Sequence, residues 1–168
     1  MAIQAGVIIG SDGGAATTLL DEDGISYPPT TLLAWLNEAL RATAFVKPDM
    51  YVKDATFTCV AGITQALPDD GIALIDIPQN VSGRVVTQVP SKLLDECNRF
   101  WPRNTQQAEV EHYTEDPRNP LRFRVYPPND GTGTLEMVYG AVPPEIAAVD
   151  DDIPVKDSYQ TILKDRKS

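Results

Sequence analysis

The sequence has few of the residue types on which most catalytic sites depend. Among 168 residues there is one histidine, and the two cysteines, Cys59 and Cys97, form no CxxC pair. Two isolated cysteines give no disulfide framework and fit a reducing compartment. No Walker loop, GxGxxG, GxSxG or HExxH motif is present. We therefore predict no catalytic residue, no metal and no cofactor, and expect that the protein is not an enzyme.

Positive charge is also scarce. Lys and Arg total 14 against 24 Asp and Glu, which gives a formal net charge of −10 at pH 7. Tight binding to nucleic-acid phosphates needs a clustered Lys/Arg footprint, and anionic membranes attract basic segments. The apolar run Ala5 to Ile9 is too short to span a bilayer, and no basic residue precedes it as in a signal peptide. These absences argue against tight DNA binding and against a membrane, and predict synthesis in the cytoplasm.

Four local patterns have the look of functional sites but lack a necessary part. His112 lies on a predicted strand with no nucleophile motif beside it, so we interpret it as a surface or pairing residue. Gly10 to Gly14 lacks the Lys-Ser/Thr of a phosphate loop. Asp21 to Gly24 has its glycine fourth, where a calcium loop needs it sixth. Asp150 to Asp152 is interpreted as a hydrated spacer.

Proline is frequent, with 14 residues, and divides the chain into short elements. The strongest element is an amphipathic helix that Thr30 or Thr31 can cap and that Pro48 ends. We expect Asn37, Glu38 and Arg41 on its wetter side. The apolar positions that follow helical spacing predict its core face: Leu32, Leu33, Trp35, Leu36, Ala39 and Leu40.

After Asp49 the pattern changes to short strands separated by turn residues. We predict strands over 52–60, 72–77, 84–89, 108–114, 121–126 and 134–139, and a short helix over 92–98 capped by Ser91. This favours an α+β fold, with an N-terminal amphipathic helix packed with an antiparallel β-sheet or small β-sandwich. Extended arms are expected at both ends, over 1–14 (flexible) and 149–168 (acidic linker and tail), around an α+β domain over 15–148.

The aromatic residues are spread over different predicted elements. We expect them to pack in the core, because aromatic side chains bury large apolar areas; they are Trp35, Phe45, Trp101, Tyr126 and Tyr139. A planar row of exposed Trp or Tyr would instead indicate a carbohydrate-binding β-module. A deep cleft in which two carboxyl groups face each other would indicate a small hydrolase. Both stay open as alternatives.

Three stretches, taken in order, carry a resemblance to a known family. The first runs from Leu19 to Gly24 through Tyr27-Pro28 into Leu32 to Ala39, with the pattern LLxWLNxA. The second is Gln65 to Pro68 with Gly71 to Asp76. The third contains His112-Tyr113, Asp116 to Pro120, Phe123, Val125 to Pro128, Val138-Tyr139 and Pro143. Together they resemble the head-to-tail adaptor (connector) proteins of tailed bacteriophages.

The resemblance implies a structural protein of the virion neck. Such a protein forms a homo-oligomeric ring of twelve subunits beneath the portal protein, extends the DNA channel and offers a platform for tail or nozzle proteins. DNA passes through without being tightly bound. A tail-completion or tail-interface protein of the same particle is the alternative. In adaptors of this kind the C-terminal segment reaches into the portal, and the matching positions are Asp157, Tyr159, Ile162 and Leu163, followed by Lys164, Arg166 and Lys167.

Overall fold

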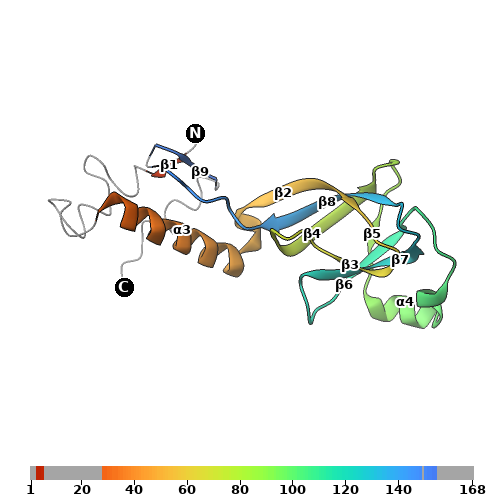
Figure 1. The fold of residues 1–168 in the computed structure, drawn as a ribbon. Coiled ribbons are helices and arrows are strands. Elements are labelled where there is room, and N and C mark those ends of the chain that lie inside the picture. Colours follow the sequence, from red (N-terminus) through yellow and green to blue (C-terminus); the bar gives the residue numbers. More distant parts are fainter. Residues whose placement is uncertain (1–2, 6–27, 149, 155–168) are drawn as a thin grey trace. The chain divides into compact units, whose positions relative to one another are not determined.

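The computed structural model describes residues 3–5, 28–148 and 150–154 of the chain (Figure 1). The chain divides into two compact units. Unit 1 contains Met1–Tyr51 and Val142–Ser168, and unit 2 is Val52–Ala141. Helices and mostly antiparallel strands together confirm the α+β class. The predicted limits of the arms, at 14 and 149, concern segments that lie largely outside the described residues and stay predictions.

The main element of unit 1 is helix α3, Pro29–Val46, followed by the 3-10 helix η1, Pro48–Met50. The residue before the helix is Pro28, with extended backbone and no side-chain cap, so the predicted cap by Thr30 or Thr31 is wrong. Proline at the first helical position needs no N–H partner and already has a helical φ, which explains this start. The predicted end before Pro48 is confirmed.

Helix α3 buries a stripe of residues at four-residue spacing, as its apolar periodicity predicts. Leu32, Leu36 and Leu40 are buried, while Leu33 and Ala39 are half-buried. Two aromatic predictions are wrong: Trp35 and Phe45 are 45% and 64% exposed. Each residue turns the helix by about 100°, so Trp35 lies well away from the neighbouring Leu36. Apolar character alone therefore did not place these side chains in the core.

Helix α3 holds the segment that follows unit 2 in the sequence. The amide of Asn37 pairs with the backbone of Ile146: Nδ2 donates to the carbonyl oxygen at 3.0 Å, and Oδ1 accepts from the N–H at 2.9 Å. One turn further along α3, Arg41 forms an ion pair with Glu145. Asn37 was predicted on the wetter side of the helix but is half-buried. Its amide makes both backbone hydrogen bonds of Ile146, as a neighbouring strand would.

The other pairing in unit 1 joins its first and last described residues. Strand β1, Ile3–Gln4, pairs antiparallel with β9, Asp152–Ile153. Asp151 accepts hydrogen bonds from the N–H groups of Ala147 and Ala148 at 3.1 and 2.8 Å. Asp150 to Asp152 are exposed, as a hydrated segment should be. Asp151 and Asp152 are nevertheless part of folded structure and not of a spacer, because a carboxylate can cap a turn that leaves N–H groups unpaired.

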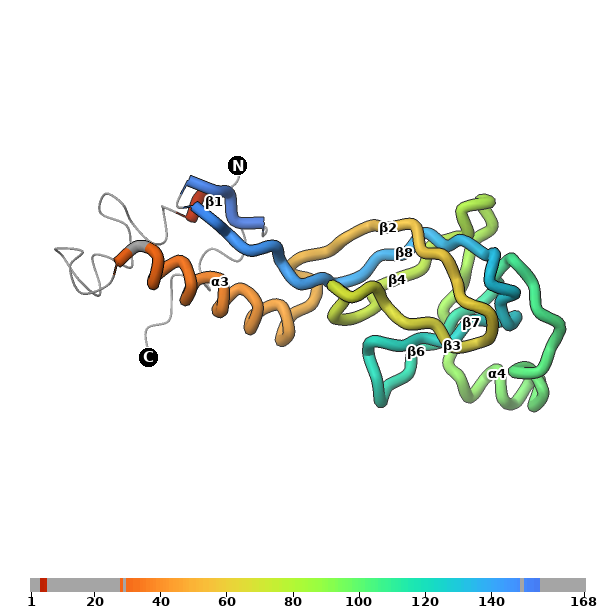
Figure 2. The backbone as a smooth tube through the Cα atoms, in the orientation of Figure 1, coloured from red at the N-terminus to blue at the C-terminus, as the bar shows by residue number. Residues whose placement is uncertain are grey.

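Unit 2 contains two sheets in two layers. Figure 1 shows β2, β8 and β4 above β3, β6 and β7, and the tube in Figure 2 follows the same path. The first sheet has the order β2-β8-β4 and is antiparallel throughout; the second has the order β3-β7-β6-β5, with its last pair parallel. The strands are β2 Val52–Thr58, β3 Gly62–Ala66, β4 Gly71–Asn80, β5 Thr87–Gln88, β6 His112–Glu115, β7 Arg122–Asn129 and β8 Thr134–Ala141.

Most predicted strands of unit 2 are present, but the strand predicted over 108–114 is found only at β6, His112–Glu115. Strand β3 was missed, and the strand predicted over 84–89 shortens to β5 with one bridge between Gln79 and Val85. Helix α4, Ser91–Cys97, begins after Pro90 with no side-chain cap. The Ser91 hydroxyl lies 2.9 Å from the hydroxyl of Thr114, so a tertiary contact replaces the predicted cap.

The core of unit 2 lies between its two sheets. Along β8, Leu135, Met137 and Tyr139 are buried at alternate positions. Along β7, Phe123 and Val125 are buried from the opposite side, and the rings of Phe57 and Phe123 meet with centroids 5.7 Å apart. Alternation along a strand sends the intervening side chains to the outer face of each sheet. A small sandwich with two outer faces results.

Buried amides fix the loops of unit 2. Asn80 pairs with Val110 through both atoms of its amide, at 2.8 and 2.9 Å. Asn129 accepts from Gly131 and Gly133 and donates to Ala108. Gln65 pairs in the same way with Val60. All three amides are at most 2% exposed, and such groups are stable in a core only when their hydrogen bonds are made.

Candidate interaction surface

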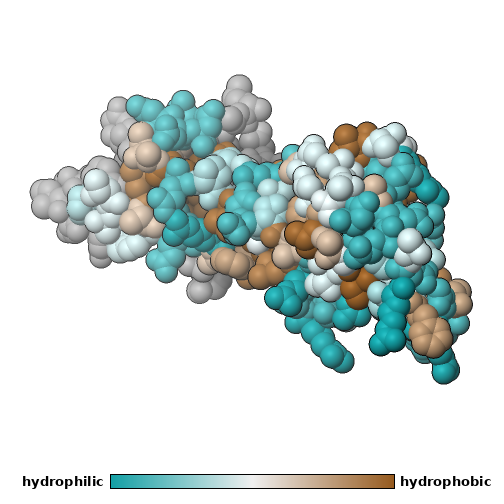
Figure 3. Space-filling model, turned by 45° about the vertical axis from the view of Figure 1, so that its right-hand side comes forward, coloured by the Kyte–Doolittle hydropathy of each residue, from teal (hydrophilic) through white to brown (hydrophobic). Residues whose placement is uncertain are grey.

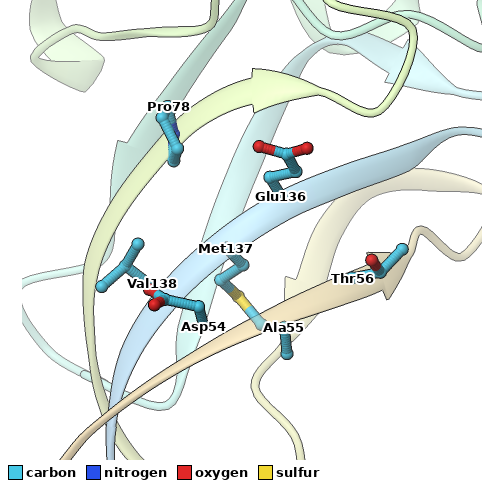
Figure 4. Close-up of a pocket in the computed structure, with 7 residues that line it drawn as sticks. All are labelled: Asp54, Ala55, Thr56, Pro78, Glu136, Met137 and Val138. Atoms are coloured by element: carbon cyan, nitrogen blue, oxygen red, sulfur yellow. The ribbon is translucent and has the colours of Figure 1, made fainter.

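The outer face of the β2-β8-β4 sheet is acidic. We name the acidic face by Asp54 and Thr56 of β2, Pro78 of β4, and Glu136 and Val138 of β8, which line a shallow hollow of about 280 Å³. Thr56 is the register partner of Glu136, and Asp54 that of Val138. Figure 4 shows Asp54 beside Val138, with the Glu136 carboxylate reaching toward β4, where Gln79 Nε2 donates to it at 2.8 Å.

The outer face of the other sheet carries the opposite charge. We name the basic face by Arg122 and Arg124 of β7 with Thr64 and Ala66 of β3, their register partners. Arg122 is exposed and Arg124 half-buried. No carboxylate of the described residues lies within 4.0 Å of either guanidinium. Two cationic side chains on one strand thus remain without an ion-pair partner in that part of the chain.

Two other cations of unit 2, Arg84 and Lys53, form ion pairs with nearby carboxylates. Arg84 pairs with Glu109 at 3.2 Å and Glu111 at 2.8 Å, and these hydrogen bonds and charges raise the pKa of its guanidinium. The Asp70 carboxylate accepts hydrogen bonds from Lys53, at 2.5 Å, and from the Tyr139 hydroxyl, at 3.1 Å. The hydrogen bond from Lys53 is the largest cause that lowers the pKa of Asp70. Arg122 and Arg124 differ from these two cations in having no ion-pair partner among the described residues, and they lie two positions apart on one side of β7.

A third surface lies at the end of unit 2 formed by α4 and the 3-10 helix η2, Trp101–Arg103. Phe100 is 71% exposed, although the preceding Asn98 holds its N–H at 3.0 Å. Trp101 beside it is buried and donates Nε1–H to Asp95 at 2.9 Å. Figure 3 shows tan, apolar side chains at its lower right, over this end of the unit, within a mostly hydrophilic surface. Hydrogen bonds thus fix the backbone at this end of unit 2, while the ring of Phe100 remains exposed.

Residues with catalytic potential are placed in structural roles. His112 is half-buried on β6, and its ring stacks on Tyr126 with centroids 6.0 Å apart, while its Nδ1 atom is buried without a hydrogen-bond partner among the described residues. Burial, with the charge of Asp130, raises the pKa of the Cys59 thiol to about 11, so it stays protonated and unreactive near neutral pH. Within the described ranges no three His, Cys, Asp or Glu residues are grouped as metal ligands would be.

The two alternatives kept from the sequence find little support. Trp101 and Tyr139 are 2% and 4% exposed and Tyr126 is half-buried, so unit 2 shows no planar row of exposed Trp or Tyr over its length. Asp54 and Glu136 line one hollow, but both are exposed and the hollow is shallow, unlike a hydrolase cleft. No helix in the described ranges is both long and apolar enough to cross a membrane.

Sequence reasoning missed both outer faces. Its seven portal-docking positions, Asp157 to Lys167, lie outside the described residues. The alternation of Arg122, Phe123, Arg124 and Val125 is visible in the sequence and could have indicated a strand with a basic outer side. The sequence does not show which sheet packs against β7. The acidic outer face of the β2-β8-β4 sheet, on the opposite side of unit 2, could therefore not be predicted.

Comparison with known proteins identifies the family. The family model described as SU10 adaptor protein matches residues 14–166, nearly the whole chain, and the chain belongs to this family. It is a family of bacteriophage adaptors, which are structural proteins of the virion and not a known family of enzymes. No curated protein matches the chain. Membership implies contact with portal and tail proteins in the neck of the particle.

Proposed function

We propose that the protein is a head-to-tail adaptor that forms a ring of twelve subunits beneath the portal. The ring extends the DNA channel and gives tail or nozzle proteins a platform. The observation that carries this proposal is the family match over residues 14–166, which covers both units. The resemblance of the LLxWLNxA segment, of which α3 contains every position, points the same way.

The physical properties of the chain support a role based on contact. Unit 2 has a buried apolar core and loops whose backbone is hydrogen-bonded by Gln65, Asn80 and Asn129, which suits a rigid building block. A net charge of −10 disfavours tight binding to phosphate, so a duplex can slide past without being held. The exposed Phe100 and Leu93, 71% and 49% exposed, are side chains of the kind that anchor protein partners.

The C-terminal tail is the proposed portal-docking segment. It combines an apolar group, Tyr159, Ile162 and Leu163, with a basic group, Lys164, Arg166 and Lys167. Such a segment suits an apolar groove with an acidic rim. We expect Asp157 to lie at the start of the docked segment.

Removal of residues 155–168 tests the docking role. The full chain is expected to form a portal-bound ring, and the shortened chain to stay unbound, as measured by light scattering after size-exclusion chromatography with purified portal. Replacing the apolar group by alanine should abolish binding. Replacing the basic group by alanine should weaken it mainly at low salt, since exposed charges are screened at high salt. Equal binding of the full and shortened chains would contradict the docking role.

A tail-completion or tail-interface protein is the second candidate in the same particle. The exposed apolar residues at the α4–η2 end fit a protein partner of either kind. The same experiment separates the two, because a tail-completion protein does not need the portal for its assembly.

A further inference from the structure

The two charged faces lie on opposite sides of one compact unit, unit 2. Their sheets share a core in which Phe57 of one meets Phe123 of the other. Asp54 and Glu136 project from one outer face, and Arg122 and Arg124 from the other. A closed ring of identical subunits needs this property, because each copy must offer two different and complementary surfaces to its two neighbours.

We propose that the basic face of one copy binds the acidic face of the next, and that this contact joins neighbouring subunits of the ring. The proposal rests on the proposed function and names the partner of these surfaces, which is a second copy of this chain. The guanidinium groups of Arg122 and Arg124 pair with the carboxylates of Asp54 and Glu136 across the contact.

Spacing and chemistry fit such a contact. Arg122 and Arg124 are two positions apart on β7, which separates them by about 7 Å along the strand. Asp54 and Glu136 lie on adjacent strands, so two carboxylates face two guanidinium groups at comparable spacing. Guanidinium and carboxylate groups form paired, charge-assisted hydrogen bonds. Gln79, a neutral amide, occupies one oxygen of Glu136, while the other makes no hydrogen bond to a described residue.

Shape supports the same partner. The acidic face is hollowed by about 280 Å³ between β2 and β4, enough to receive the end of an arginine side chain. On the β3 side the arginines have only small neighbours, Thr64 and Ala66, so a second sheet can approach closely there. On the β6 side the neighbour of Arg124 is Thr114, which contacts Ser91 at the start of α4. Duplex DNA is a poorer occupant, because two arginines supply few of the phosphate contacts that a DNA-binding surface makes.

Charge reversal of each face tests the proposal on the full chain with purified portal. We expect Arg122→Glu with Arg124→Glu, and separately Asp54→Lys with Glu136→Lys, to reduce ring formation at least tenfold. An equal mixture of the two variants is expected to recover rings, since each variant then presents to the other the opposite charge. Those rings alternate and close only with an even number of subunits, as a ring of twelve allows.

A matched control separates the face from net charge. Arg118→Glu, in the exposed turn between β6 and β7, makes the same change in charge as Arg122→Glu alone, and is expected to leave ring formation unchanged where Arg122→Glu reduces it. Recovery in the mixture also rules out misfolding as the cause of the loss, because a misfolded variant cannot be rescued by a partner.

The outcomes distinguish this proposal from the proposed function. If the unaltered chain forms portal-bound rings and both face variants do so equally well, the contact proposed here is wrong and the adaptor function stands. If the unaltered chain forms no ring with portal, the function fails and the contact fails with it. Loss of duplex binding in a gel-shift assay by the Arg122/Arg124 variant, with intact rings, would assign the basic face to DNA and overturn the proposal.

Discussion

In both units an asparagine side-chain amide hydrogen-bonds to backbone groups of a distant segment, but the two amides differ in burial. In unit 2, the amide of Asn129 is fully buried and binds three backbone groups. In unit 1, the amide of Asn37 is half-buried and binds the two backbone groups of Ile146. Burial makes an unpaired polar group costly. Fully buried hydrogen bonds therefore hold the loops of unit 2, whereas half-buried ones hold residues 142–148 of unit 1, which we name the return segment.

The largest expected effect is that of Asn129→Ala. The substitution leaves the N–H of the buried Gly133 and the carbonyl oxygen of Ala108 without a partner. We expect a loss of about 3 kcal/mol in the free energy of unfolding, measured by denaturant titration. Asn119→Ala, which removes one exposed turn bond to Leu121, should cost less than about 1 kcal/mol. Equal losses of unfolding free energy for Asn129→Ala and Asn119→Ala would contradict the claim that fully buried hydrogen bonds hold the loops of unit 2.

A smaller effect is expected from Asn37→Ala. It removes two half-buried hydrogen bonds to Ile146, and water can replace part of them, so we expect about 1–2 kcal/mol. Hydrogen exchange at the Ile146 amide is the direct measurement and should speed up by about tenfold or more. Glu38→Ala on the same helix is the control. Unchanged exchange at Ile146 would show that Asn37 does not hold the return segment.

The smallest effect concerns the exposed pair of Lys53 and Asp70, whose side chains are 39% and 38% exposed. The folded state lowers the pKa of Asp70, so its contribution is present above the ordinary value of 3.8 and is lost as the pH falls below it. Asp70→Asn should cost less than about 1 kcal/mol at pH 7, since solvent screens the pair.

The pH dependence of that difference gives the check. The stability gap between the unaltered chain and Asp70→Asn should close on acidification, as measured by thermal melting from pH 7 to pH 3. Asp69→Asn, whose carboxylate makes no hydrogen bond or ion pair within the described residues, is the control. A gap that widens in acid would contradict the sign of the pKa shift.

The periodicity of the sequence correctly predicted which residues of helix α3 are buried together. The stripe of Leu32, Leu36 and Leu40 was foreseen because helical spacing fixes the angles between these residues. The exposure of Trp35 was not foreseen, because hydropathy does not show how wide the buried stripe of the helix is. Strand β3 was missed because Gln65 interrupts its apolar pattern, and that glutamine is buried with its amide hydrogen-bonded to the backbone of Val60 and Gly62.

Long-range contacts account for what sequence could not predict. The role of Asn37 depends on Ile146, which is 109 residues away in the chain. The two charged faces depend on which sheets lie back to back, and this follows from the pairing of β8 with β2 and of β7 with β3. The family was predicted from ordered motifs and is confirmed, because motif order does not require knowledge of contacts.

Electron microscopy of the neck in the native particle tests the central claim most directly. The account predicts twelve copies of this chain in a closed ring against the portal, with Arg122 and Arg124 of each copy facing Asp54 and Glu136 of its neighbour. Copies found away from the portal, or present singly with no contact between them, would contradict it.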